Sequence, residues 1–275
     1  MTVDVAVIPT AGRGTRMLPA TRSVPKALLP VVDRPAIQWV VEEGMRAGVR
    51  EFVIVVNPEV DHLLAGHFAG SGDFGVLEGF EDVRIETVVQ REPLGLGHAV
   101  LEARDVVAGR HFYCLLGDNI AVPGRDQLAP MGEASDGRSV ILLRELDDEL
   151  LDKYGVIVPG ERFGDRVVEM LGAIEKPGRE HAPSRLGLVG RYLFDPEVFD
   201  RLAGQEPGYG GEIQLTDAID AVARDGRCLG YVGDADLLDV GTPATYLEAI
   251  AELGLWHPDL RDRWRSFLDG LVHLA

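Results

Sequence analysis

Cysteine and lysine are both scarce in this chain of 275 residues. The two cysteines, Cys114 and Cys228, belong to short apolar runs; both are predicted to be buried small hydrophobic residues, and their spacing excludes a cysteine metal site. The basic residues divide into 24 arginines and only three lysines, Lys26, Lys153 and Lys176. A lysine retained in such an arginine-rich chain indicates a need for a compact ammonium group, which marks these three positions as candidates.

Long apolar stretches and an excess of positive charge are absent as well. No stretch is long enough to span a bilayer, and the N-terminus lacks the basic region of a signal peptide, so we expect a cytoplasmic protein without a membrane partner. The formal net charge is −18. A duplex-binding protein usually carries a basic face, so nucleic acid is not an expected partner. An anionic substrate must therefore meet a local positive pocket, often with the help of Mg²⁺.

The hydrophobic pattern predicts an α/β protein. Short β-branched runs alternate with helical patterns up to about residue 125, which predicts a mostly parallel, doubly wound sheet; later strand-like runs have fewer helices between them and extend this sheet. The Gly-rich stretch Ala69–Gly79 is predicted to be a loop. The expected strands are Val3–Pro9, Glu51–Val56, Val83–Gln90, His111–Leu116, Ser139–Leu143, Gly155–Val158, Val167–Glu175 and Leu186–Tyr192. The expected helices are Ile37–Ala47, Glu59–Phe68, Gly97–Val107, Glu197–Leu202, Ile213–Arg224, Thr242–Leu253 and Asp259–Leu271.

A glycine-rich loop follows the first predicted strand, and it reads Ala11-Gly12-Arg13-Gly14-Thr15-Arg16. Its glycines let the backbone approach a polyphosphate, whose oxygens the consecutive N–H groups can bind. Arg16 can add a bidentate phosphate contact, and Lys26 supplies a second cation. A Walker A loop would need Gly-Lys-Ser/Thr, which is absent, and a Rossmann fingerprint would need a third glycine where Met17 stands. A purely structural turn is the remaining alternative for the two glycines taken alone.

The wider pattern is more specific. G-x-G-T-R-x-x-P followed by P-K-x-x-x-P resembles the signature of sugar-1-phosphate nucleotidylyltransferases, and Met17–Thr21 and Leu29–Asp33 are similar to the bacterial UTP–glucose-1-phosphate uridylyltransferases. The similarity runs from about residue 3 to 270. It implies a Rossmann-like nucleotidyltransferase fold, α/β with a mixed, mainly parallel central sheet flanked by helices. It also implies the formation of a nucleotide sugar from a nucleoside triphosphate and a sugar 1-phosphate, with release of pyrophosphate.

The resemblance also implies a domain organisation and roles for individual residues. We expect a single domain over residues 1–275, with a nucleotide-binding half at about 1–125, a sugar-phosphate half at 126–240 and C-terminal helices at 241–275. The nucleotide-binding residues are predicted to be Ala11, Gly12, Gly14, Thr15, Gln90, Gly95, Gly97 and His98. Sugar-phosphate binding is assigned to Gly155, Glu175, Lys176, Gly190 and Glu212. The catalytic residues would be Arg16, Lys26, Asp118 and Lys176, and the Mg²⁺ ligands Asp118 and Asp239.

Each of these side chains has an alternative interpretation when taken singly. Gln90 could be an exposed polar residue at a strand end, whereas its amide together with the turn 95–99 suits the edge of a pyrimidine base. Asp118 or Asp239 could be a cap or a turn former, whereas two carboxylates plus phosphate oxygens suit Mg²⁺. Glu175 and Lys176 could form no more than an ion pair at a strand end.

Substrate identity and function class have alternatives too. Gly117-Asp118-Asn119 and the run 239–243 are closer to the glucose-1-phosphate thymidylyltransferases, and Ala27-Leu28 replaces the usual Glu-Met of the uridylyltransferases. UTP and glucose 1-phosphate are the favoured substrates, with dTTP or another sugar-like phosphate as the alternative. A catalytically silent nucleotide-sugar sensor and a glycosyltransferase are the other classes. Trp256, Trp264 and Phe267 near the C-terminus predict a homo-oligomer.

Overall fold

The computed structural model describes residues 2–69, 77–234 and 237–272. By its internal contacts the chain forms two compact units. Unit 1 comprises Met1–Gly12, Gly44–Leu116 and Gln127–Asp234; unit 2 comprises Arg13–Glu43, Gly117–Asp126 and Ala235–Ala275. Most of the loop predicted at Ala69–Gly79 lies outside the described residues.

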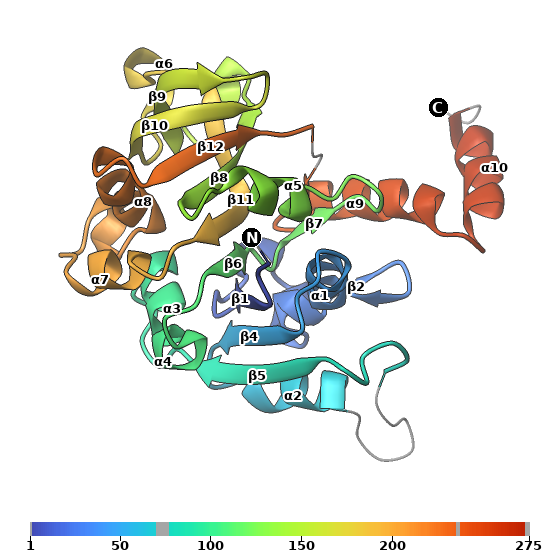
Figure 1. The fold of residues 1–275 in the computed structure, drawn as a ribbon. Helices are drawn as coiled ribbons and strands as arrows, with labels where there is room; N and C mark the ends of the chain where they lie inside the picture. The colour runs from blue at the N-terminus through green and yellow to red at the C-terminus, as the bar shows by residue number, and fades with distance from the viewer. Residues whose placement is uncertain (1, 70–76, 235–236, 273–275) are drawn as a thin grey trace. The chain divides into compact units, whose positions relative to one another are not determined.

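Unit 1 is built on a nine-stranded mixed sheet with the order β5-β4-β1-β6-β11-β8-β12-β10-β9 (Figure 1). Strands β5, β4, β1 and β6 are parallel, as are β8 and β12, whereas β11 and β10 run antiparallel to their neighbours. An additional contact of β9 with β11, Val156 opposite Gly187, closes the last five strands into a ring. The strands are β1 (Val5–Pro9), β4 (Glu51–Val56), β5 (Arg84–Val89), β6 (Phe112–Leu115), β8 (Ser139–Glu145), β9 (Val156–Phe163), β10 (Val167–Ile174), β11 (Leu186–Phe194) and β12 (Cys228–Val232).

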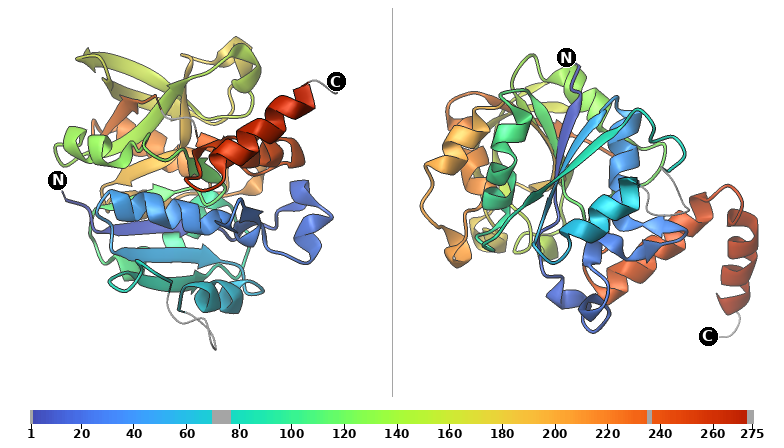
Figure 2. Two further views of the ribbon diagram at one scale, coloured as in Figure 1. Left: turned by 90° about the vertical axis from the view of Figure 1, so that its right-hand side faces the viewer. Right: turned by 90° about the horizontal axis from the view of Figure 1, so that it is seen from below.

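Helices cover this sheet because their apolar residues recur at helical spacing. In α8 (Leu215–Arg224) the buried residues Leu215, Ala218, Ile219 and Val222 form one stripe. This stripe packs in the same core as α3 and α7 and as alternate residues of β1 and β4 (Figure 2). The unit also contains α2 (Asp61–Ala69), α3 (Leu96–Glu102), α4 (Arg104–Val107), α5 (Leu128–Ala134), α6 (Gly178–His181) and α7 (Val198–Ala203).

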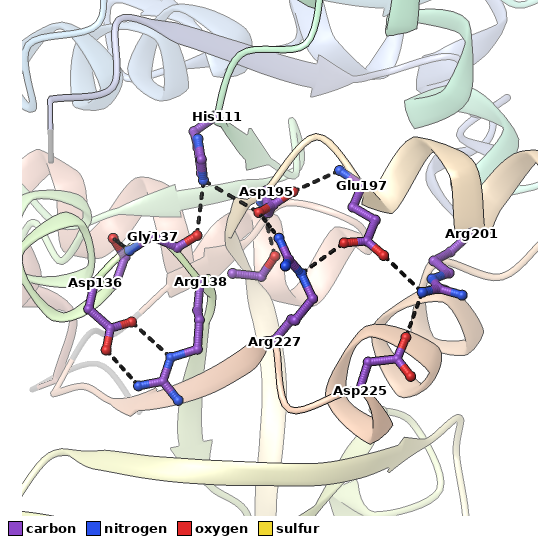
Figure 3. Close-up of polar contacts among 11 residues, drawn as sticks. His111, Asp136, Gly137, Arg138, Asp195, Glu197, Arg201, Asp225 and Arg227 are labelled. Atoms are coloured by element: carbon purple, nitrogen blue, oxygen red, sulfur yellow. Dashed lines mark hydrogen bonds and ion pairs between the residues drawn. The ribbon is translucent and has the colours of Figure 1, made fainter.

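A charged network joins the amino ends of β6, β8 and β12 to the carboxyl end of β11 (Figure 3). The buried Asp195 receives a hydrogen bond from Arg227 at 2.5 Å, and the same guanidinium contacts Glu197 at 2.8 Å. His111 lies 3.7 Å from the Asp195 carboxylate, and Ser139 accepts a hydrogen bond from the Asp195 backbone N–H. These charges are compensated within the fold, which favours a structural role for this edge.

Unit 2 is assembled from three separate stretches of the chain. Its core contains Val31, Trp39, Ile120, Val240 and Leu253, which come from all three stretches. Short antiparallel pairs join β2 to β3 and β7 to β13, and α10 packs on α9 (Figure 1). The elements are the 3-10 helices η1 (Thr15–Met17), η2 (Ala20–Arg22) and η3 (Lys26–Leu28), strands β2 (Pro30–Val31), β3 (Arg34–Pro35), β7 (Asn119–Ala121) and β13 (Leu237–Asp239), and helices α1 (Ala36–Arg46, in this unit to Glu43), α9 (Pro243–Trp256) and α10 (Arg261–Val272).

The mixed sheet flanked by helices confirms the predicted fold class. Cys114 and Cys228 are buried as predicted, and burial raises the pKa of both thiols. Some element predictions were wrong. The helix expected at Gly97–Val107 is divided at Ala103 into α3 and α4. The helix expected from Ile213 begins two residues later, because the backbone groups of Ile213 bond to a different loop. Helix α5 and strand β12 were not among the expected elements.

Candidate active site

The glycine-rich loop divides between the units. Ala11 and Gly12 belong to unit 1, where the Ala11 carbonyl accepts a long hydrogen bond from Asn57 at 3.4 Å. Gly14 belongs to unit 2 and has a left-handed backbone, φ 61°. A Cβ at Gly14 would lie 3.1 Å from the Thr21 methyl carbon and 3.2 Å from the Lys26 Cβ, so both conformation and space favour glycine. Because 3-10 turns, not an α-helix, follow the loop, the Rossmann alternative is not supported.

Four of the predicted residues gather within unit 2. The Lys26 Nζ donates a hydrogen bond to Asp118 Oδ2 at 2.6 Å. The space beside Gly241 brings in the others: a Cβ built there would lie 2.6 Å from Asp239 Oδ1 and 3.1 Å from both Arg16 Nη2 and Lys26 Nζ. Two cations and two carboxylates, drawn from three stretches of sequence, therefore converge around one glycine.

Strand pairing and a helix cap position the two carboxylates. Strands β7 and β13 place Asp239 opposite Asn119, and the Val240 backbone N–H donates to the Asp118 carbonyl at 2.9 Å. Asp239 Oδ1 accepts from the Gly241 backbone N–H at 2.8 Å, and Oδ2 accepts from the Thr245 hydroxyl at 3.3 Å. Thr245 itself completes a reciprocal cap at the start of α9 with Thr242. Thr245 was not among the predicted site residues, although T-x-x-T after Gly241 is a capping signal.

These carboxylates are chemically suited to a hard divalent cation. Among the described residues, no three His, Cys, Asp or Glu side chains come together as a metal site. Asp118 and Asp239 offer carboxylate oxygens, and Gly241 keeps a side chain out of the space beside Asp239. Mg²⁺ is usually held by one or two carboxylates together with substrate phosphates and water, so this pair fits it.

The residues predicted to bind the base form a turn in unit 1 that is held by hydrogen bonds. Gln90 follows β5 and is 6% exposed, so it is not the exposed strand-end residue of the alternative interpretation. Its amide Nε2 donates to the Gly95 carbonyl at 3.1 Å and lies 3.0 Å from His98 Nδ1. The other His98 nitrogen lies 3.3 Å from Glu102. The side chain of Gln90 is thus held in one orientation by the turn that follows it.

The same turn packs directly against the segment that precedes α8. Gly95 has φ 103°, and a Cβ there would lie 2.7 Å from the Glu212 Cβ. A Cβ at Gly97 would lie 2.7 Å from the Ile213 carbonyl oxygen. Two backbone hydrogen bonds of 2.8 Å join the segments, from Ile213 N–H to the Leu94 carbonyl and from Gly97 N–H to the Ile213 carbonyl. Glycine at 95 and 97 therefore permits a close backbone approach.

Three of the predicted sugar-side residues, Gly155, Glu175 and Lys176, meet at the end of β10. Glu175 Oε2 accepts a hydrogen bond from the Thr216 hydroxyl at 2.6 Å, and Oε1 lies 3.0 Å from Lys176 Nζ. The ion pair of the alternative interpretation is present, but Thr216 adds a second, separate contact. A Cβ at Gly155 would lie 3.2 Å from Glu175 Oε2 and 3.1 Å from Thr216 Oγ1, so that glycine leaves room beside the carboxylate.

The other two predicted sugar-side residues, Gly190 and Glu212, lie in other segments of unit 1. Gly190 has φ 86°, and its carbonyl accepts from the Leu116 N–H at 3.0 Å, within the part of β11 where the register with β8 shifts. Glu212 is exposed. Burial, with the nearby Glu175 and Asp220 carboxylates, raises the pKa of Asp217.

Within the residues described, no helix is both long and apolar enough to cross a bilayer.

Comparisons with known proteins agree with these observations. A family model described as nucleotidyl transferase matches residues 5–254. UTP–glucose-1-phosphate uridylyltransferase 2 of Staphylococcus saprophyticus is 37% identical over 285 residues, covering 98% of each chain. A UTP-bound UGPase from Acinetobacter baumannii superposes with a TM-score of 0.86 at 32% identity, covering 97% of this chain and 98% of that one. A UDP-glucose pyrophosphorylase complexed with UDP-glucose superposes with a TM-score of 0.85 at 32% identity, covering 93% of this chain and 100% of that one. The chain belongs to the nucleotidyl transferase family, among its bacterial UTP–glucose-1-phosphate uridylyltransferases.

Proposed function

We propose that the protein makes UDP-glucose from UTP and glucose 1-phosphate and releases pyrophosphate. The observation that carries this proposal is the gathering of Arg16, Lys26, Asp118 and Asp239 around Gly241. It supplies fixed positive charge for phosphates and paired carboxylates for a metal in a chain that is otherwise strongly acidic. The relative from S. saprophyticus is named for the same reaction, which supports the choice of substrates.

The proposed chemistry is a single in-line displacement. A phosphate oxygen of glucose 1-phosphate forms a bond to the α-phosphorus of UTP, and the bond from that phosphorus to the bridging β-phosphate oxygen breaks. Its electron pair leaves with pyrophosphate, so no covalent intermediate with the protein is needed. Catalysis then depends on positioning and on charge neutralisation, as in other phosphoryl-type transfers.

The cations have separate tasks in this displacement. Arg16 and Lys26 bind the triphosphate and stabilise negative charge on the leaving pyrophosphate. Lys176, next to Glu175, binds the phosphate of the sugar and aims its attacking oxygen. Asp118 and Asp239 would hold Mg²⁺, which would offset the negative charge of the phosphates. Lys26 already contacts Asp118, so a cation bound there would share that carboxylate with the lysine.

The recognition residues of unit 1 explain the choice of substrates in this proposal. Glu175 accepts hydrogen bonds from sugar hydroxyls, while Gln90 and the turn 95–99 bind the pyrimidine. UTP and dTTP differ at the base by one methyl group, worth about 1–3 kcal/mol in a pocket, so some use of dTTP is expected. UTP is favoured over the thymidylyltransferase alternative because the run Thr15–Asp33 and the turn 90–99 resemble the uridylyltransferases. We propose that the whole chain acts as one functional domain, in the cytoplasm where nucleoside triphosphates are available.

A matrix of nucleoside triphosphates against sugar 1-phosphates tests the proposal, with pyrophosphate release and product mass as readouts. The highest kcat/KM is expected for UTP with glucose 1-phosphate. A preference for dTTP would favour the thymidylyltransferase alternative, and a preference for ATP or GTP would refute pyrimidine recognition. Binding without any pyrophosphate release would point to a sensor. Release of UDP from UDP-glucose onto an acceptor would point to a glycosyltransferase.

We also propose a homo-oligomer formed through the C-terminal helices. Leu247 on α9 and Phe267 on α10 are 66% and 53% exposed, and a cavity of 390 Å³ lies between these helices with Trp264 and Phe267 in its lining. Exposed apolar area of this kind usually marks a contact surface. Sedimentation of the wild type and of Phe267→Ser tests it. A wild-type monomer would contradict the proposal, as would an unchanged oligomer in a well-folded Phe267→Ser, Leu247→Ser double variant.

A further inference from the structure

The carboxylate of Glu175 is held by a residue with no assigned role. Thr216 donates its hydroxyl hydrogen to Oε2 at 2.6 Å, while Lys176 contacts the other oxygen. Only 14% of the Glu175 side chain is exposed, and Thr216 is buried. Hydrogen bonds to charged acceptors are short and about twice as strong as neutral ones. Thr216 therefore fixes one oxygen of the carboxylate in a site where water competes little.

Thr216 can do this because its own position is doubly determined. It lies in the first turn of α8, whose apolar stripe is buried against the sheet of unit 1. Three residues earlier, Ile213 is clamped to the base-reading turn by its two backbone hydrogen bonds with Leu94 and Gly97. The hydroxyl of Thr216 is thus fixed relative to both the sheet and the turn.

The space beside this pair suits a ligand. Gly155 lies next to both Glu175 Oε2 and Thr216 Oγ1. Any larger residue at position 155 would fill the volume beside these two atoms. Because the Thr216 hydroxyl occupies one lone pair of Oε2, a donor entering that space finds the remaining acceptor positions at a fixed angle. A carboxylate with a fixed angle discriminates between donors placed differently on similar ligands, whereas a mobile one adapts to each.

We propose that Thr216 is a positioning residue which, by orienting Glu175, determines the selectivity of the enzyme among sugar 1-phosphates that differ in one hydroxyl group. The proposal rests on the function proposed above. Thr216 touches no reacting atom in it and acts through the Glu175 carboxylate alone.

The test compares Thr216→Val, which keeps the shape and removes the hydroxyl, with Thr216→Ser, which keeps the hydroxyl. Thr87→Val is a matched control in unit 1, because the Thr87 hydroxyl also donates to a carboxylate, that of Asp61. Steady-state kcat and KM are measured with glucose 1-phosphate and with galactose 1-phosphate. The KM for UTP and the melting temperature are measured on the same preparations.

Thr216→Val is expected to raise the KM for glucose 1-phosphate about 10-fold or more, the usual effect of losing a hydrogen bond to a charged group. Its preference for glucose over galactose 1-phosphate should fall by a similar factor, with the KM for UTP little changed. Thr216→Ser should stay within about 3-fold of wild type, and Thr87→Val should not alter selectivity. Unchanged selectivity in Thr216→Val, or equal defects in the Val and Ser variants, would overturn the proposal.

A failure of the proposed function would look different. In that case the wild type itself would release no pyrophosphate from any pair of substrates. Calorimetric titration of wild type, Thr216→Val and Thr216→Ser with UDP-glucose and UDP-galactose would then decide the role of Thr216. Preference for one epimer that is lost in Val and kept in Ser supports it, and an absence of that pattern refutes it.

Discussion

Replacing Gly241 by alanine should impair catalysis far more than folding. The new methyl carbon would lie 2.6 Å from Asp239 Oδ1, well inside the roughly 3.5 Å at which nonbonded atoms attract best. It would also lie 3.1 Å from Arg16 Nη2 and Lys26 Nζ, so the carboxylate cannot retreat toward the cations without displacing them. The backbone at Gly241 lies outside the left-handed region, so alanine adds no conformational strain of its own.

The size of the effect follows from that displacement. Asp239 must move by nearly an ångström, and misplacing a catalytic group by that much can lower the rate about 100-fold, or about 2.7 kcal/mol of transition-state stabilisation. Overpacking of a buried site costs about 1–3 kcal/mol of stability, which leaves a protein of ordinary stability folded at 25 °C. We therefore expect Gly241→Ala to lose about 100-fold in kcat/KM and to require more Mg²⁺ for half-maximal rate.

The assay measures pyrophosphate release against Mg²⁺ concentration at 25 °C, with melting curves on the same samples. Gly66→Ala is the control, because a Cβ at that position in α2 meets no atom within 4 Å. This control should retain full activity. If Gly241→Ala kept its activity within about 3-fold of wild type, the assignment of Asp239 to the reacting site would be refuted.

Three further predictions follow from the site and from unit 2. Chelation of Mg²⁺ should abolish activity. Asp118→Ala should lower the turnover number much more than the melting temperature. Near-normal turnover in that variant would refute the assignment of Asp118 as a metal ligand. Lys176→Ala should mainly raise the KM for the sugar phosphate, with only partial rescue by Lys176→Arg because a planar fork replaces a point charge; an unchanged KM would contradict its role. The hydrogen bond from Arg34, with a smaller one from His257, lowers the pKa of Asp33 from 3.8 to about 2. A lowered pKa in the folded state stabilises the protein above pH 3.8, and this contribution is lost as the pH falls toward 2. In acid denaturation followed by circular dichroism, the stability gap between wild type and Asp33→Asn should close across that interval; a gap independent of pH would contradict the assignment.

The spacing of apolar residues predicted most elements of the fold, because the same spacing decides which face of a helix or strand can be buried. The run Glu51–Val56 is apolar, β-branched and bounded by polar residues, and it forms β4 with those limits. The division at Ala103 could not be predicted, since the apolar spacing of residues 97–107 is continuous. In the structure the Ala103 N–H donates to the Val100 carbonyl three residues back, as in a 3-10 turn, and this separates α3 from α4. Strand β12 needs glycine at position 230, because a Cβ there would collide with Leu143. This glycine interrupts the run of apolar residues that would otherwise predict a strand.

The site shows the same limit. Resemblance selected Arg16, Lys26, Asp118 and Asp239, but nothing in their spacing shows that they meet, because the contacts span more than 90 positions. The Thr216 hydroxyl bonds to the Glu175 carboxylate, 41 positions earlier in the chain. The Thr245 hydroxyl on α9 bonds to the Asp239 carboxylate on β13. The carboxylate partners of these hydroxyls are visible only in three dimensions, so the sequence predicted the charged groups but not the hydrogen bonds that orient them.

Because unit 2 is assembled from three separate stretches, it can fold only late during synthesis of the chain. Val31 and Trp39 emerge from the ribosome before Ile120, and Val240 and Leu253 emerge after it. Chains fold from the N-terminus as they are made, but this core cannot close before its last stretch appears. Joining residues so far apart also carries a loop-closure cost that only the completed core repays. Arg16 and Lys26 are therefore translated well before the stretch that contains Asp239 and Gly241, so a nascent chain cannot assemble the proposed phosphate-binding cluster until that stretch has emerged.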